Sequence, residues 1–450
     1  MLLAILYLQH PGISNIYIAY FDIHYRNIIR SYNQTSLLPF SFDIRCVDSY
    51  NFYMRNLKML SLIISCAVLA FSSVAVASDD TKAEEGSGNN KPVPARISVA
   101  KRTSTRIWIN IRHSESAAQS NDVKGMQLHI CDRKKSVNIK KSIVPSQKTY
   151  SFGNLYPYRT YYIRARYYSK ENGKYIYYPW TGSLKANTKS AHRKQILRSM
   201  NAVSKKKAVR TFATDYRLKK SKAGRRLIAY TKKLQKRYRI RYIAVDLKSG
   251  EGFASGAKNF MYSASCLKGP YVAALCKHKP GSYKRSRGMM RSTIVVSNND
   301  TYKSLRRRYG SSCMKKLMKY SGVSSFDYRR RYTYVPVRDL GKLWVGTYWY
   351  FYREKNRRSK ACRRMYTHGY QSFIYSAMKG RFKVHAKPGW YPGGGFNVQN
   401  DAGIIMAKVA GKKRPYALAV MTSACGRHIK LRKLVRLINK VHSDIARRSK

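Results

Sequence analysis

The sequence predicts a multidomain protein in which an all-β sandwich precedes an α+β domain, an antiparallel sheet flanked by helices with a helical subdomain. Three observations support this fold class. Apolar and polar residues alternate with a period of two through 93–189, whereas residues 223–450 combine strand and helix periods. At 450 residues, with 44% hydrophobic content, the chain can fill the cores of two or three domains.

The segment 54–77 has the parts of a secretory signal peptide. Met54 to Lys58 is a short basic start, a largely apolar run follows, and Ala75 and Ala77 form an Ala-x-Ala cleavage site. The sequence therefore predicts a secreted or cell-wall-associated protein.

The flanks of this signal are interpreted with it. Residues 1–53 are expected to be an over-extended start or a disordered segment, and a genuine extension with a transmembrane anchor is the alternative. Ile-Ile-Ser before Cys66 leaves a lipid anchor at Cys66 open, although the apolar run continues past it. The acidic and small residues of 78–92 predict a disordered linker.

The charge is the most unusual feature of the composition. With 90 basic and 20 acidic residues, the formal net charge is +70 at pH 7. This excess predicts binding to polyanions and says nothing about the fold. For an exported chain we expect anionic cell-wall polymers as partners and no specific nucleic acid.

The cysteines do not have the spacing of a metal site. Of the eight, Cys46 and Cys66 lie in the part expected to be removed, and the other six are far apart, without a CxxC pair. Neither a metal nor a cofactor is expected. Disulfides are compatible with export, and we expect Cys276 to pair with Cys313 or both to be free buried thiols.

Residues 93–189 contain the alternating segments of a small antiparallel sandwich. The apolar positions that would face its core are Ile97, Val99, Ile107, Ile109, Ile111, Met126, Leu128, Ile130, Tyr161, Ile163, Ala165 and Tyr167. Asn172-Gly173 predicts a hairpin turn. The interleaved Arg and Tyr residues also fit RNA binding, but the strand alternation explains them more simply.

Together these residues resemble a fibronectin type III domain. The likeness depends on the Leu155-x-Pro157-x-x-x-Tyr161 stretch, which leads into a Tyr-rich strand, and on Trp180 before the closing strand. After it, residues 190–222 are basic and lack strong periodicity, which predicts a linker with partial helix.

Residues 223–450 alternate between helix and strand signals. A helix is expected from Ala223, then two strands in RYRIRYIAVDLKSGEGFAS, a helix around 265–275 and another that continues through Tyr320. GFNVQNDAGIIMAKV and RPYALAVMTSA predict antiparallel strands near the end. The last segment is an amphipathic helix whose apolar stripe is Leu431, Leu434, Ile438, Val441 and Ile445.

Ser265 and Lys268 are the first candidates for catalysis. On a helix that starts near Ser265, residues three apart share a face, so the lysine amine can reach the serine hydroxyl. A serine beside a lysine has the arrangement of a nucleophile with its base. In a chain this basic the spacing also occurs by chance, as with Ser204 and Lys207.

Two later segments add to this pair. VVSNNDTY offers Ser297 and Asn299, and HAKPGWYPGG offers Lys387 and Gly389. Each has an ordinary structural explanation, since Ser and Asn favour helix N-caps and a Lys-Pro-Gly sequence favours a turn. In this order the segments resemble the Ser-x-x-Lys, Ser-x-Asn and Lys-Thr-Gly motifs of class A β-lactamases and penicillin-binding D,D-peptidases.

The resemblance implies a role for each residue. Ser265 would attack a carbonyl, Lys268 would accept its proton, and Ser297 would pass a proton to the leaving nitrogen. Asn299 would hold the substrate amide and Lys387 would attract a substrate carboxylate. The implied substrates are peptidoglycan stem peptides or β-lactams.

An oxyanion hole is implied at the end of the third motif. It would consist of the backbone N–H groups of Ser265 and Trp390, the residue that follows Gly389.

Two departures from the family pattern bear on activity. Pro388 replaces the Thr or Ser of the third motif and removes a hydroxyl and a strand N–H. The segment 322–336 is short and has no Glu that could activate a deacylating water, and Asp327 is its only acid. We expect an acyl-enzyme that persists, or, as the alternative, a non-catalytic wall-binding protein on a degenerate scaffold.

Overall fold

A computed structural model of the chain describes residues 94–448, apart from 116–121, 134, 368, 394 and 395, and two short strands near the start. The chain divides into the units Met1–Ser87 and Gly88–Lys450. In the first unit, β1 (Leu2–Leu6) pairs antiparallel with β2 (Tyr17–Phe21). The predicted signal peptide, Cys66 and the linker 78–92 lie outside the described residues, so these interpretations stay predictions.

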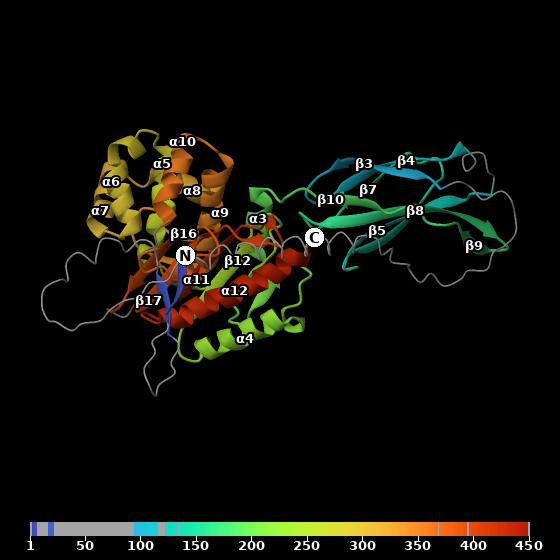
Figure 1. Cartoon of the computed structure of the whole chain (residues 1–450). Helices are drawn as coiled ribbons and strands as arrows, with labels where there is room; N and C mark the ends of the chain where they lie inside the picture. The colour runs from blue at the N-terminus through green and yellow to red at the C-terminus, as the bar shows by residue number, and fades with distance from the viewer. Residues whose placement is uncertain are drawn as a thin grey trace, which may run out of the picture. The chain divides into compact units, whose positions relative to one another are not determined.

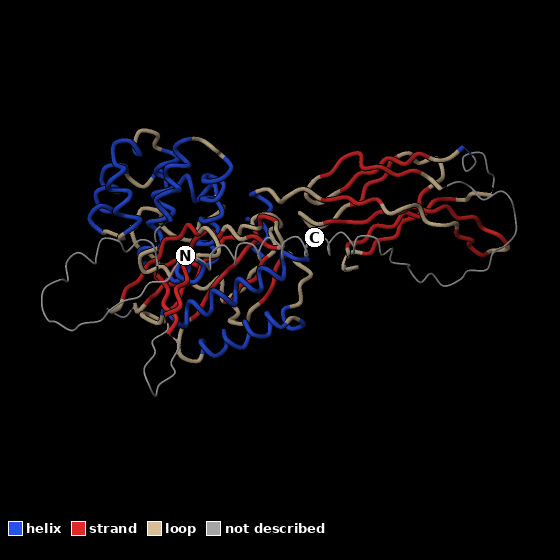
Figure 2. The backbone as a smooth tube through the Cα atoms, in the orientation of Figure 1, coloured by secondary structure: helices blue, strands red, loops and turns tan. Residues whose placement is uncertain are grey.

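The first part of the second unit consists of two antiparallel sheets (Figures 1 and 2). One is three-stranded, in the order β3-β4-β7, and the other is five-stranded, β10-β8-β5-β6 with β9 paired to β8. The strands are β3 Arg96–Arg102, β4 Ile107–Arg112, β5 Gly125–Asp132, β6 Asn138–Ile143, β7 Thr149–Phe152, β8 Thr160–Glu171, β9 Lys174–Tyr177 and β10 Leu184–Asn187.

The alternation in the sequence corresponds to the buried faces of these sheets. On β8, Tyr161, Ile163, Ala165 and Tyr167 are all buried, with the intervening residues partly exposed. The hairpin from β8 to β9 turns at Asn172 and Gly173, whose φ values of 47° and 80° are those of a tight primed turn. The likeness of this part to a fibronectin type III domain stays a prediction.

A six-stranded sheet organises the second part, in the order β11-β13-β12-β20-β17-β16, with every neighbouring pair antiparallel. Its strands are β11 Arg210–Phe212, β12 Ile240–Asp246, β13 Gly252–Ser255, β16 Val384–Tyr391, β17 Val398–Ile405 and β20 Tyr416–Thr422. Two small ladders complete it: β14 Phe260–Tyr262 with β15 Tyr334–Pro336, and β18 Lys408–Val409 with β19 Lys412–Lys413.

Helices cover both faces of this sheet. On β12, Tyr242 and Ala244 face a core shared with α4 (Lys222–Gln235), α11 (Phe373–Met378) and α12 (His428–Arg448). Ile243 and Val245 face the opposite core, which the remaining helices build. These are α3 Arg193–Ser199, α5 Lys268–His278, α6 Ser282–Val295, α7 Asn299–Tyr309, α8 Ser312–Tyr320, α9 Val337–Arg353 and α10 Arg357–Arg364.

Short 3₁₀ turns connect several of these elements. They are η3 Met200–Ala202, η4 Leu218–Lys220, η5 Ala264–Leu267 and η6 Met365–Thr367. The predicted α+β architecture of the C-terminal part, a sheet flanked by helices beside a helical group, is confirmed (Figure 1).

The segment 190–222, predicted as a linker with partial helix, does contain a helix but is packed into the α+β part of the chain. This segment contains α3, whose Ile196 is fully buried, and the edge strand β11, which pairs with β13. The strand is only three residues long, too short for alternation to reveal it, and backbone hydrogen bonds fix it in place. Residues 190–222 therefore belong to the α+β part of the chain.

Two further expectations need correction. The helix expected through Tyr320 is two helices, because Gly310 ends α7 with a φ of 68°. The Cys276–Cys313 pair does not form: both thiols are free and buried, which was the alternative. Among the described residues, no helix combines the length and apolar character needed to cross a membrane.

Candidate active site

Ser265 and Lys268 lie at the junction of the 3₁₀ turn η5 with helix α5. The strand β14 before the turn is held by β15, and Ser263 N donates to Thr333 O at 2.9 Å, so the start of the turn is fixed. Ala264, immediately before Ser265, has a φ of 46°, a backbone strain that is frequent at functional sites. Ser265 is partly exposed, whereas Lys268 is fully buried.

The Lys268 ammonium connects the first two predicted motifs. Its Nζ donates to Ser297 O at 2.6 Å and to Asn299 Oδ1 at 2.7 Å, and it lies 3.5 Å from Ser297 Oγ. Ser297 has a φ of 62°, which turns its carbonyl and hydroxyl toward the lysine. Within the described residues Ser265 Oγ makes no hydrogen bond, so it is free to meet a substrate.

The second motif does contain a helix N-cap, but the capping residue is Asn298, which lies between the candidates Ser297 and Asn299. Asn298 is the N-cap of α7, and its Oδ1 accepts a hydrogen bond from Thr301 N at 2.8 Å. Because Asn298 satisfies the helix end, Ser297 and Asn299 remain available to Lys268.

The third motif lies on β16, the edge strand beside the turn. A Cβ added at Gly389 would be 2.6 Å from Ser265 N and 2.5 Å from Cys266 N, so the strand backbone contacts the start of η5 directly. Pro388 is tolerated here because an edge strand can spare an N–H group. Trp390 follows and lines the same cavity as Ser265.

Lys387 is buried under the turn and does not line the cavity. Its side chain packs against Gly269 of α5. Burial, together with the positive charge of Lys268, lowers the pKa of Lys387 to about 7. Burial also lowers the pKa of Lys268 to about 8, against a raising effect of Asp300. Both lysines therefore titrate near neutrality, as a proton acceptor in catalysis requires.

Asp401 of the neighbouring strand β17 is a buried carboxylate on the α11 side of the sheet. It is opposite Pro388 in the β16–β17 register, and burial raises its pKa to about 7 although Ile374 N and Ser372 Oγ donate to it. No pattern in the sequence singled it out, because the pairing of β16 with β17 places it.

A cavity of about 250 Å³ opens over the serine. Ser265, Asn299 and Trp390, predicted from the sequence, line it together with residues that were not predicted: Tyr262, Ala264, Asp300, Lys303, Arg331, Tyr332 and Tyr391. Arg331 and Lys303 give the cavity a positive charge, which suits an anionic substrate group.

Two tyrosines that line this cavity, Tyr262 and Tyr391, pack against the ring of Phe396. Tyr262 stacks on Phe396 with ring centroids 4.5 Å apart, and Tyr391 lies 5.7 Å from Phe396. Tyr262 comes from β14, whereas Tyr391 and Phe396 lie five residues apart at and after the end of β16, so the cluster joins two segments that are far apart in the chain.

The segment 322–336, in which a base for the deacylating water was looked for, contributes Tyr332 to the cavity. Tyr332 donates to Asn299 Oδ1 at 2.8 Å, and burial raises the pKa of its hydroxyl, which makes it a poor base. Asp327 is partly exposed, is paired with Arg329 at 3.0 Å, and does not line the cavity. Asp300 is the carboxylate that does line it, and the sequence analysis gave it no role.

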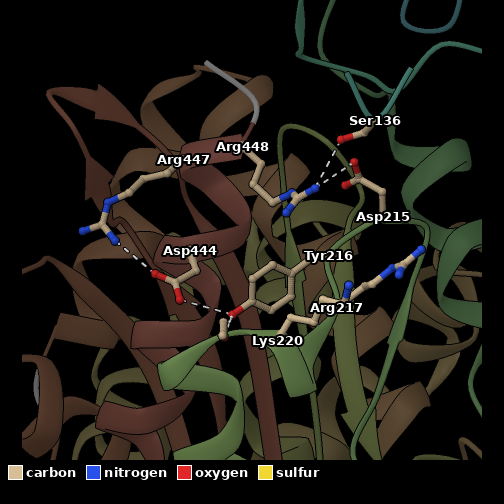
Figure 3. A pocket seen from close by; sticks show the side chains of 9 residues that line it. Ser136, Asp215, Tyr216, Arg217, Lys220, Asp444, Arg447 and Arg448 are labelled. Atoms are coloured by element: carbon tan, nitrogen blue, oxygen red, sulfur yellow. Dashed lines mark hydrogen bonds and ion pairs between the residues drawn. The ribbon is translucent and has the colours of Figure 1, made fainter. Parts of the chain in front are cut away.

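A second cavity, of about 540 Å³, lies around the end of α12 (Figure 3). Its charged residues are largely paired: Arg448 with Asp215 at 3.1 Å and Arg447 with Asp444 at 3.1 Å. It has no serine beside a buried lysine. We therefore place the candidate active site at Ser265.

The described residues contain no group of three or more His, Cys, Asp or Glu side chains that could hold a metal ion.

Comparison with known proteins identifies a family for part of the chain. Residues 275–448 match the model of the Beta-lactamase enzyme family. The match includes Ser297, Asn299 and Lys387 and begins after Ser265 and Lys268. No curated protein matches the chain.

Solved structures similar to this chain include a β-lactamase from Streptomyces albus G, with 15% identity, a TM-score of 0.39, and coverage of 49% of this chain and 99% of that one. A β-lactamase from Chitinophaga pinensis DSM 2588 has 14% identity, a TM-score of 0.40, and coverage of 50% and 100%. PBP-A has 13% identity, a TM-score of 0.38, and coverage of 48% and 96%. The family match at residues 275–448 therefore lies within the α+β part of this chain.

Proposed function

We propose that this protein is an exported serine hydrolase that forms an acyl-enzyme on Ser265 with β-lactams or peptidoglycan peptides. The observation that carries the proposal is the buried Lys268, which lies one helical turn after Ser265 and contacts Ser297 and Asn299. Neutral Lys268 takes the proton of Ser265 Oγ as the oxygen bonds to the substrate carbonyl carbon. The carbon–nitrogen bond then breaks, and the proton reaches the leaving nitrogen through Ser297 Oγ.

The backbone of η5 and β16 would stabilise the developing oxyanion. The N–H groups of Ser265 and Trp390 are the proposed donors, and the contact of Gly389 with the turn supports their closeness. Lys387 would add positive potential for a substrate carboxylate.

Deacylation is expected to be slow. Asp327 does not line the cavity, and Tyr332, whose hydroxyl donates to Asn299 Oδ1, has a raised pKa and is a poor base. A long-lived acyl-enzyme is the behaviour of a penicillin-binding protein rather than of an efficient β-lactamase.

The test is the intact mass of the purified protein after incubation with a penicillin, followed over time. We expect one adduct that maps to Ser265, persists over the incubation and is absent from Ser265→Ala. An equal adduct on Ser265→Ala would refute the role of this serine. Hydrolysed drug without an adduct would instead show that another group, with Asp300 as the first candidate, supplies the deacylating base.

The second candidate function is non-catalytic binding of anionic cell-wall polymers on a degenerate scaffold. Pro388 favours it, because the hydroxyl that would hold a substrate carboxylate is missing from the third motif. Intact drug without any adduct would support this alternative. Displacement of the protein from cell walls by moderate salt would show that screened charge carries the binding.

Export and the identity of the β-sandwich are parts of the same proposal. Sequencing the N-terminus of the mature protein would test cleavage after Ala77. The fibronectin type III likeness is supported by Tyr161, whose hydroxyl accepts a hydrogen bond from Tyr156 N at 2.8 Å, as in a tyrosine corner.

A further inference from the structure

A groove lies between the C-terminal part of α4 and the first turn of α12, two helices that cover the face of the sheet remote from Ser265. Helices α4 and α12 lie side by side, and Tyr230 of α4 donates to Lys430 O of α12 at 3.1 Å (Figure 1). The groove between them has a volume of about 910 Å³. Its charged lining residues are Lys232, Lys233, Lys236, Arg237, Lys430 and Lys433.

The positive charge of this groove is not compensated. No acidic residue lines it, and α4 contains neither Asp nor Glu. The single acid of α12, Asp444, lies near the other end of that helix and is paired with Arg447. Within the described part of the chain, none of the basic lining residues makes an ion pair. Clustered like charges repel each other, so an anion placed among them is attracted.

The tyrosines of the groove hold some of these lysines in place. Lys433 Nζ lies 5.1 Å from the centre of the Tyr230 ring, and Lys430 Nζ lies 5.7 Å from that of Tyr238. Ammonium groups that face both rings leave them poorly suited as platforms for stacking bases. The groove therefore favours an anionic polymer without aromatic bases.

The shape of the groove and the lysine side chains that line it restrict the class of ligand further. A hollow between two helices fits a chain, whereas a flat membrane surface is matched by a protruding apolar face. Lysine ammonium groups are point charges that bind phosphate without demanding a planar partner.

We propose that the α4–α12 groove binds a linear phosphodiester polymer of the polyol phosphate type. This inference rests on the polymer-binding candidate function and gives it a site and a ligand class. It does not depend on acyl transfer, because the groove and Ser265 belong to opposite faces of the sheet.

The test compares two triple variants of the full chain with equal net charge. In the groove variant, Lys233, Lys236 and Lys433 are replaced by Gln. In the control, Lys284, Lys316 and Lys319, exposed residues of α6 and α8, are replaced by Gln. Binding of poly(glycerol phosphate) is measured by calorimetry over a range of salt concentrations.

We expect the groove variant to lose at least about tenfold in affinity and about 2 units in the salt slope, the effect of three lost phosphate contacts. The control is expected to lose far less. Equal losses in the two variants would overturn the proposal, because net charge alone would then explain binding.

Two further ligands distinguish binding of the polymer from binding of a membrane surface or of a nucleic acid. The polymer assignment would be refuted if the groove substitutions weakened binding to phosphatidylglycerol vesicles or to oligothymidylate more than binding to poly(glycerol phosphate). Ser265→Ala is expected to bind the polymer like wild type, so that a failure of acyl transfer and a failure of the groove give different results. Far-ultraviolet circular dichroism and thermal melting check that both triple variants fold.

Discussion

At the scale of single residues, the chemistry of the site depends on how burial changes two lysines. Lys268 and Lys387 are both close to fully buried, burial lowers the pKa of each, and the positive charge of Lys268 lowers that of Lys387 further. A lysine at the surface of this very basic chain would stay protonated at neutral pH. Burial therefore turns two common residues into groups that can exchange protons near pH 7.

Acylation of Ser265 is expected to have a bell-shaped pH profile. Lys268 must be neutral to accept the proton, and with a pKa of about 8 its neutral fraction rises with pH. Lys387 must be charged to attract a carboxylate, and with a pKa of about 7 its charged fraction falls with pH. The second-order rate constant of adduct formation should peak between these two values.

Stopped-flow or quenched mass spectrometry with a penicillin measures this profile. An acyl donor without a carboxylate serves as the control and is expected to lose only the alkaline limb. If the penicillin rate instead keeps rising through the pKa of Lys268 and then levels off, Lys387 does not attract the carboxylate.

At the scale of elements, the site is a junction of a 3₁₀ turn, the start of a helix and an edge strand. The turn η5 offers Ser265, α5 begins with Lys268, and β16 closes the site from the side. The closeness of β16 to η5 leaves no room for a side chain at Gly389, because the atoms that it would meet are backbone atoms.

Replacement of Gly389 by Ala is expected to separate β16 from the turn and to open the oxyanion hole. The new Cβ would lie 2.6 Å from Ser265 N, which neither backbone can accept without moving. We expect acylation by penicillin to slow by about 10²–10³-fold, the loss typical of a missing oxyanion donor.

The matched control is Gly393→Ala, since a Cβ at Gly393 meets nothing within 4 Å. The measurement is the rate of acylation by penicillin, compared between the two variants and wild type. Equal rates in all three would show that the contact between β16 and the turn does not serve the oxyanion hole.

At the scale of the whole molecule, buried ion pairs use several of the few acidic residues. Asp132, Asp246, Glu251 and Asp339 are nearly fully buried, and Asp132 and Glu251 both contact Arg159. Few acidic residues are therefore left at the surface to pair with its many lysines and arginines, which is consistent with the unpaired lysines of the α4–α12 groove.

Arg159 is the centre of the largest of these buried clusters. It contacts Asp132 at 3.0 Å and both Asp215 and Glu251 at 3.1 Å, and these partners come from the β-sandwich and from the α+β part. Arg159→Met would leave buried carboxylates without a counter-charge and is expected to lower the free energy of unfolding by about 3–5 kcal/mol.

Urea unfolding at neutral pH measures this change, with the exposed Arg102→Met as the control. A loss for Arg159→Met no greater than for the control would show that the cluster does not stabilise the chain.

The sequence by itself determined the α+β architecture of the C-terminal part and the residues of the three motifs. The periods of two and of 3.6 residues are local signals of burial, and each motif is a short run of residues, so both are visible along the chain. The strands of 223–450 and the amphipathic stripe of α12 were predicted for this reason.

Only the tertiary structure decided how these motifs meet and what surrounds them. Asp401 lies opposite Pro388 through strand pairing, Tyr332 reaches Asn299 through the course of 322–336, and the short β11 gains its place from hydrogen bonds to β13. The lysines of α4 and α12 form a groove because the two helices pack side by side. Such contacts join residues far apart in the chain, and the pattern of a single segment contains no information about them.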